Sequence, residues 1–216
     1  MSSTWIEITS TRRLAAKERD IKAHFTNRFE RADRAKVGPV PVTSVPRTLM
    51  DLGAVCPPIR VEIALDNAVA RGLTSLPALD RYLNEVGGRG KRGAAVMRSV
   101  LAPRLEAGGT PTNGGETKLF VALRRARLPI PKMQYDVLDG SGRRVANVDF
   151  AYPERRLAIE LESWTYHSGK RRMDRDLDRR NDLTGANWRV IWARNSDLER
   201  PDQLIQRIRE DFEDHP

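Results

Sequence analysis

The chain has 216 residues, enough for one large domain or two small ones with a buried core. Hydrophobic residues make up 39% of it and charged residues 31%. No apolar run approaches the roughly 20 residues of a membrane-spanning helix, which excludes helical membrane proteins, and the net charge of +9 favours nucleic acid over an acidic protein as partner.

The expected location is a reducing cytoplasm. Cys56 is the single cysteine, so neither an internal disulfide nor a thiolate metal site can form. The beginning of the chain also contains no signal-peptide core.

The region 1–105 is predicted to be mostly helical, with short strands at its start. Strands are expected at 5–9, 22–26 and 40–43, and helices begin near Ser44, Pro57, Ser75 and Ala94. A glycine-rich basic segment at 87–93 separates the last two helices. Its spacing does not match a phosphate-binding P-loop, so it is interpreted as a turn, with contact to a nucleic-acid backbone as the alternative.

A linker at 106–115, rich in glycine and threonine, is predicted to precede a second region at 116–216. This region begins with a helix from Glu116 and continues with strands. The expected strands lie at 134–138, 144–152, 157–161 and 188–192, and the final helix lies at 203–212.

The strands on either side of residues 153–156 form an acidic hairpin. If the turn takes four residues, Tyr152 pairs with Leu157 and Asp149 lies opposite Glu160, and Glu162 falls on the same face. Opposed carboxylates destabilise a strand pair unless a cation lies between them, and Mg²⁺ or Mn²⁺ is the usual occupant. The alternative is an ordinary strand pair with one face in water.

Several blocks of the second region match a known family in both type and spacing. They are Glu116, Val148-Asp-Phe with Tyr152-Pro-Glu, Leu157-Ala-Ile-Glu-Leu-Glu, His167, Arg175-Asp176, Arg179-x-Asn181-x-Leu183 and Trp188-Arg-Val-Ile. On these residues, 116–216 resembles the DUF559 group of very-short-patch-repair-like endonucleases in the PD-(D/E)XK superfamily. The run from Pro41 to Leu52 in the first region resembles the helical region of AbiEi-type antitoxin proteins.

The resemblance implies an α+β or α/β fold, in which helices flank a small mixed, restriction-endonuclease-like sheet behind a mostly helical domain. It also implies that Asp149, Glu160 and Glu116 bind the metal. Glu162 stands where the superfamily has its catalytic lysine, and His167 could then transfer protons in its place. The alternative role for His167 is a hydrogen-bonded framework residue.

Four arginines and one asparagine after the acidic hairpin are expected to contact nucleic acid. They are Arg171, Arg172, Arg175, Arg179 and Asn181. Arg179 could instead form a purely structural ion pair. Ser163 and Asn187 stand where the family prefers glycine.

The function predicted from the sequence is metal-dependent hydrolysis of phosphodiester bonds, with DNA as the expected substrate and Mg²⁺ or Mn²⁺ as cofactor. Two alternatives stay open. One is a non-catalytic DNA-binding regulator of the antitoxin type on a nuclease-like scaffold. The other is an interaction protein that neutralises a partner toxin through its helical region. The sequence does not predict an oligomeric state.

Overall fold

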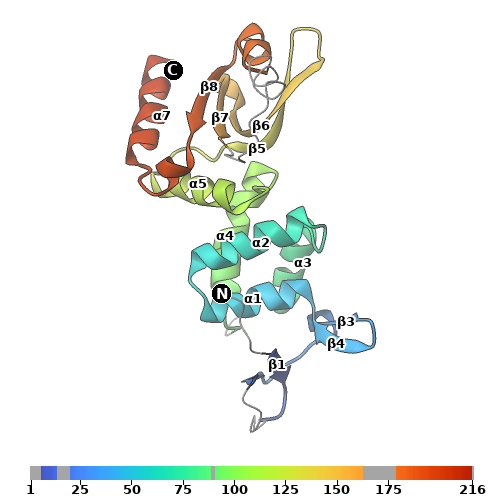
Figure 1. The fold of residues 1–216 in the computed structure, drawn as a ribbon. Coiled ribbons are helices and arrows are strands. Elements are labelled where there is room, and N and C mark those ends of the chain that lie inside the picture. Colours follow the sequence, from blue (N-terminus) through green and yellow to red (C-terminus); the bar gives the residue numbers. More distant parts are fainter. Residues whose placement is uncertain (1–5, 14–19, 89–90, 163–178, 216) are drawn as a thin grey trace.

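The computed structural model describes residues 6–13, 20–88, 91–162 and 179–215. Within them, an N-terminal part of short strands and helices precedes a C-terminal part built on a four-stranded sheet (Figure 1). The N-terminal elements are β1 (Ile6–Ser10), β2 (Ile21–Phe25), the 3-10 helix η1 (Arg31–Asp33), β3 (Arg34–Val37), β4 (Val40–Thr43), α1 (Val45–Val55), α2 (Pro58–Ala70), α3 (Leu76–Val86) and α4 (Ala94–Ala107). The C-terminal elements are α5 (Gly114–Arg125), β5 (Lys132–Leu138), β6 (Arg144–Tyr152), η2 (Pro153–Arg155), β7 (Leu157–Leu161), β8 (Arg189–Ala193), η3 (Asn195–Leu198) and α7 (Asp202–Asp214), and residues 179–185 are also helical.

Side-chain caps set the starts of α1, α3 and α5. Ser44, Ser75 and Asn113 each adopt an extended backbone and accept hydrogen bonds from backbone N–H groups in the first turn of α1, α3 and α5. These N–H groups have no partner inside the helix, so each cap satisfies a donor that would otherwise be lost. Among the helices that the structure describes, none is long and apolar enough to cross a membrane.

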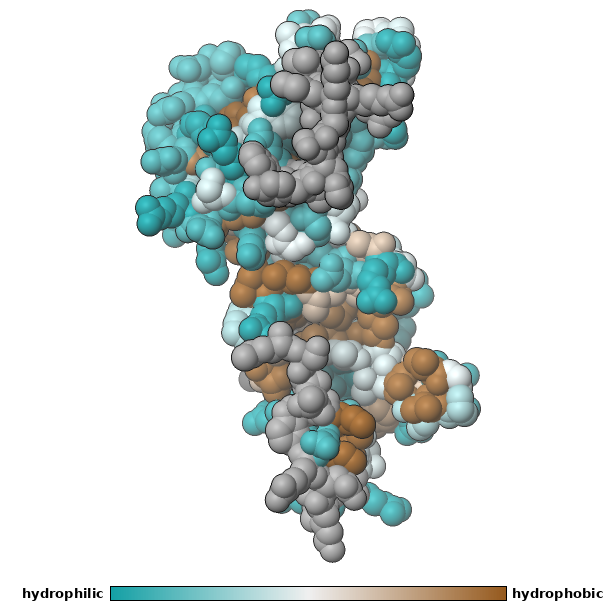
Figure 2. Space-filling model, in the orientation of Figure 1, coloured by the Kyte–Doolittle hydropathy of each residue, from teal (hydrophilic) through white to brown (hydrophobic). Residues whose placement is uncertain are grey.

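The four helices α1–α4 enclose one apolar core, formed by residues such as Met50, Leu65, Leu79 and Leu101. The strands lie outside this core. β1 and β2 pair in parallel, and β3 and β4 form an antiparallel hairpin in which β3 was not predicted from the sequence. Figure 2 shows hydrophobic surface where this hairpin protrudes.

The C-terminal sheet has the order β5-β6-β7-β8. β5, β6 and β7 are antiparallel, and β8 adds to β7 in parallel, so the sheet is mixed as predicted. The predicted pairing of Tyr152 with Leu157 is confirmed. Apolar side chains from α5, β6, β7 and α7 form the larger core of this part, and a smaller core includes Leu183 and Trp188. The predicted fold class is therefore confirmed.

The connection between the two parts is shorter than the linker predicted at 106–115. α4 continues to Ala107, which packs in the core of the C-terminal part, and α5 already begins at Gly114. A buried polar network spans the junction. The Arg104 guanidinium of α4 donates to Asp66 and Glu62 of α2, at 2.5 and 3.0 Å, and the Thr117 hydroxyl of α5 donates to Asp66 at 2.9 Å. α2 therefore ties α4 to α5.

Candidate functional site

Two carboxylates from neighbouring strands meet near the end of the acidic hairpin. The observed register of β6 and β7 extends to the pair of Phe150 and Ile159, and one further step places Asp149 opposite Glu160. The Asp149 carboxylate accepts a hydrogen bond from the backbone N–H of Leu161 at 2.9 Å. This bond fixes the Asp149 side chain over the end of β7, beside Glu160.

The environment of Glu160 disfavours its charge. Its exposed fraction is 3%, and burial, together with the negative charge of Asp149, raises the pKa of Glu160 to about 8. Arg179 opposes this shift, because its guanidinium donates to the Glu160 carboxylate and to the backbone carbonyl of Asn147. The remaining upward shift shows that Arg179 compensates the negative charge only in part.

A third carboxylate, Glu116, lies at the start of α5. It is buried, and its oxygens accept hydrogen bonds from the N–H and hydroxyl of Thr112, both at 2.7 Å, from the Asn113 amide and from the Gln134 amide at 3.1 Å. Burial raises its pKa, and the negative charge of Asp149 adds to the increase. The negative charge of Asp149 therefore acts on Glu116, whose own oxygens hold the start of α5 in place.

Gln134 is a site residue that the sequence analysis missed. It lies in β5 between Met133 and Tyr135, which pair with Phe150 and Val148 of β6. The register therefore places Gln134 opposite Asp149. Its φ is +49°, a left-handed conformation that costs of order 1–3 kcal/mol and tends to occur at functional sites. The other non-glycine residues with positive φ in the described ranges lie in turns between elements; they are Arg127, Arg156 and Asn187.

The strained backbone at Gln134 is held from two sides. Its amide donates to Glu116, and its carbonyl accepts from the Asn147 amide at 3.0 Å. Gln134 therefore connects the start of α5 to the strand that carries Asp149. This connecting role of Gln134 has no signature in the sequence, because a single polar residue between Met133 and Tyr135 fits an ordinary strand.

The other predicted site residues are placed differently. Glu162 follows β7 and lies 3.9 Å from the Arg180 guanidinium, and Asn181 is exposed. His167, Arg171, Arg172 and Arg175 lie outside the described residues.

The three carboxylates predicted to bind a metal do not form a complete ligand set as placed. Among the residues that the structure describes, no group of three or more Asp, Glu, His or Cys side chains is arranged to hold a metal ion. The physical reason lies at Glu116, whose oxygens are engaged by donors at the start of its own helix and by Gln134. Asp149 and Glu160 are the carboxylates that the fold brings together.

Comparison with known proteins finds limited similarity. No protein-family model matches the chain. Over 121 residues it is 34% identical to the uncharacterized proteins MT2308 and Rv2248 from two strains of Mycobacterium tuberculosis, which covers 56% of this chain and 43% of each relative. The match thus spans less than half the length of these relatives. Among solved structures, the catalytic domain of the homing endonuclease I-Bth0305I aligns with 47% of this chain and 95% of its own, at 21% identity and a TM-score of 0.37.

Proposed function

We propose that the protein is a metal-dependent nucleic-acid phosphodiesterase whose active site is built on Asp149 and Glu160, with DNA as the substrate. The observation that carries the proposal is the placement of these two carboxylates side by side, with Glu160 buried. Such an arrangement costs stability when both groups are ionised. A bound cation would offset that cost.

The donor chemistry fits a hard divalent cation. Mg²⁺ prefers oxygen ligands and is usually bound through one or two carboxylates, with water and substrate phosphate oxygens completing its shell. Asp149 and Glu160 supply such a pair without a third protein ligand. Because the Arg179 guanidinium contacts a Glu160 oxygen, the ion would compete with Arg179 for this carboxylate.

When bound, the ion would lower the pKa of a water molecule and polarise the phosphate group. The chain's own residues would orient the site. The N–H of Leu161 fixes Asp149, and Gln134 holds the start of α5 against the sheet. Arg179, displaced from Glu160, would bind a phosphate oxygen of the substrate, and we assign proton transfer to His167.

The test compares isosteric variants of the pair with a matched control. Asp149→Asn and Glu160→Gln each remove one charge, whereas Glu154→Gln removes an exposed charge from the turn of the same hairpin. With DNA or RNA and Mg²⁺ or Mn²⁺, wild type and Glu154→Gln should cleave. Each site variant should lose at least about a hundredfold in rate, as expected for loss of an electrostatic contribution of a few kcal/mol. Equal cleavage by all four proteins would refute the proposal.

A non-catalytic nucleic-acid-binding scaffold is the second candidate. It is favoured by the Arg179 contact to Glu160, which neutralises the pair in part without an ion. The two candidates differ in their response to metal. A phosphodiesterase site should raise the Tm of wild type with Mn²⁺ and lose this rise in Asp149→Asn, whereas a retired scaffold should bind DNA with no Mn²⁺-dependent change in Tm.

A further inference from the structure

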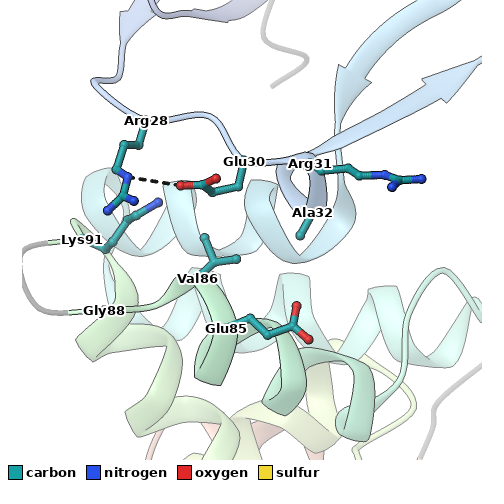
Figure 3. A pocket seen from close by; sticks show the side chains of 8 residues that line it. All are labelled: Arg28, Glu30, Arg31, Ala32, Glu85, Val86, Gly88 and Lys91. Carbon is teal, nitrogen blue, oxygen red and sulfur yellow. Dashed lines mark ion pairs between the residues drawn. The ribbon is translucent and has the colours of Figure 1, made fainter.

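A polar pocket lies beside η1 in the N-terminal part. Figure 1 shows this region of the chain apart from the sheet that carries the acidic hairpin. The pocket has a volume of about 740 Å³, and it opens between the segment that leads into η1 and the connection from α3 to α4. Charged residues line it, among them Arg28, Glu30, Arg31, Glu85 and Lys91 (Figure 3). The volume lies in the range of ligand-binding pockets.

Lys91 is the unusual residue in this pocket. Its ammonium nitrogen is buried and has no hydrogen-bond partner among the residues that the structure describes. The last carbonyls of α3, which a lysine at a helix end often binds, are already taken by Arg98, which donates to the carbonyls of Leu83 and Gly87 at 3.0 and 2.7 Å. A buried, unpaired ammonium costs stability, and the described residues offer Lys91 no contact that compensates this cost.

Lys91 is a cation of this pocket that no ion pair within the described ranges neutralises. Glu30 is paired with Arg28 at 3.2 Å, and Glu85, which also lines the pocket, forms no ion pair with Lys91 among the described residues. Figure 3 shows Arg28 and Lys91 on the same side of the pocket, with Arg31 directed outward. A phosphate group at this end of the pocket would therefore pair with Lys91 directly and share the Arg28 guanidinium with Glu30.

We propose that this pocket binds a phosphate group of the nucleic-acid backbone through Lys91 and Arg28. The inference rests on the proposed function in one respect, because it takes nucleic acid as the ligand. It adds a contact between the protein and the phosphate backbone at a place outside the acidic hairpin. Arg92, next to Lys91, is exposed, and the net charge of +9 favours the same ligand. The site would supply affinity and position, and it would not discriminate between base sequences.

The test measures binding in EDTA, so that cleavage plays no part. Binding of a DNA duplex is followed by fluorescence anisotropy over a range of salt concentrations for wild type, Lys91→Gln, Lys91→Arg and Lys36→Gln. Lys36→Gln removes the same charge from exposed β3. We expect Lys91→Gln to bind about tenfold more weakly and to lower the slope of log affinity against log salt by about 0.9, the effect of one lost phosphate contact. Lys91→Arg should stay within about threefold of wild type, and Lys36→Gln within about twofold.

Thermal unfolding checks that the variants fold. Because Lys91→Gln removes a buried unpaired charge, its Tm should equal or exceed that of wild type. Weaker binding together with a lower Tm would overturn the proposal, since the lysine would then act on the fold. Equal losses in Lys91→Gln and Lys36→Gln would also overturn it, because they would indicate general electrostatic attraction.

A titration with inorganic phosphate separates the possible sources of the ligand. If phosphate raises the Tm of wild type but not of Lys91→Gln while DNA affinity is unchanged, the ligand is a soluble phosphate and the nucleic-acid assignment is wrong. The outcomes also separate this inference from the proposed function. DNA binding through Lys91 without any cleavage would refute only the phosphodiesterase, and cleavage with unchanged binding in Lys91→Gln would refute only this pocket.

Discussion

Replacing Glu160 with glutamine should change the stability of the protein in a pH-dependent way. Burial and the negative charge of Asp149 raise the pKa of Glu160 from its ordinary value of 4.5 to about 8 in the folded state. Between these two values the folded protein holds a proton that the unfolded chain has lost. Stability therefore falls as pH rises from the unfolded toward the folded pKa. Glutamine resembles the protonated acid and does not titrate, so the variant lacks this loss.

The magnitude follows from the pKa shift, because each unit corresponds to about 1.4 kcal/mol. Between about pH 5 and pH 9, the penalty from Glu160 grows by up to about 4 kcal/mol. Near pH 5, the variant and wild type should unfold with nearly equal free energies. Near pH 9, the variant should be the more stable protein, by about 2–4 °C in Tm for each kcal/mol.

The assay is thermal or urea unfolding in EDTA at several pH values, with Glu154→Gln as the control. The control residue is exposed, so its substitution should leave the pH profile unchanged. If Glu160→Gln is equally destabilising at every pH, then Arg179 fully stabilises an ionised Glu160. The reasoning from burial and repulsion would then be wrong.

Three further substitutions test the fold around the site. Gln134→Gly relieves the left-handed strain but removes the amide that donates to Glu116. Because these two effects oppose each other, the free energy of unfolding should change by less than about 1 kcal/mol, while the cleavage rate should fall at least tenfold. A fall in stability without a fall in cleavage would contradict the positioning role. Arg104→Ala leaves buried Asp66 without its cation and leaves Glu62 with Arg124 alone, and urea unfolding should show a loss of about 3–5 kcal/mol. A loss below about 1 kcal/mol would argue against the buried network. Tyr82→Phe removes the hydroxyl that donates to buried Asp33 at 2.6 Å and should cost about 1–3 kcal/mol, with no effect on cleavage.

Local rules account for the part of the site that could be predicted. The four-residue turn after Tyr152 and the alternation of side chains along β6 and β7 set the register, which in turn places Asp149 opposite Glu160. Ser44 and Ser75 likewise marked helix starts through their own side chains. These features depend on residues close together in the sequence, so they can be predicted from it.

Other contacts join residues far apart in the chain. The predicted linker gave no sign that Arg104 would be buried against Asp66, 38 residues away. The one signal in the sequence is that Glu62 and Asp66, four residues apart, share one face of α2 with buried apolar residues. The pairing of Gln134 with Glu116 had no such signal.

The sequence by itself determined the helices, the acidic hairpin and its register, because each follows from side-chain period, caps and turn length. Only the tertiary structure decided that β8 joins β7 in parallel, that Gln134 adopts a left-handed backbone beside Asp149, and that the Lys91 ammonium has no hydrogen-bond partner among the described residues. The physical reason is that periodicity specifies which face of an element is buried, whereas the neighbour that covers the face is chosen by packing of the whole chain.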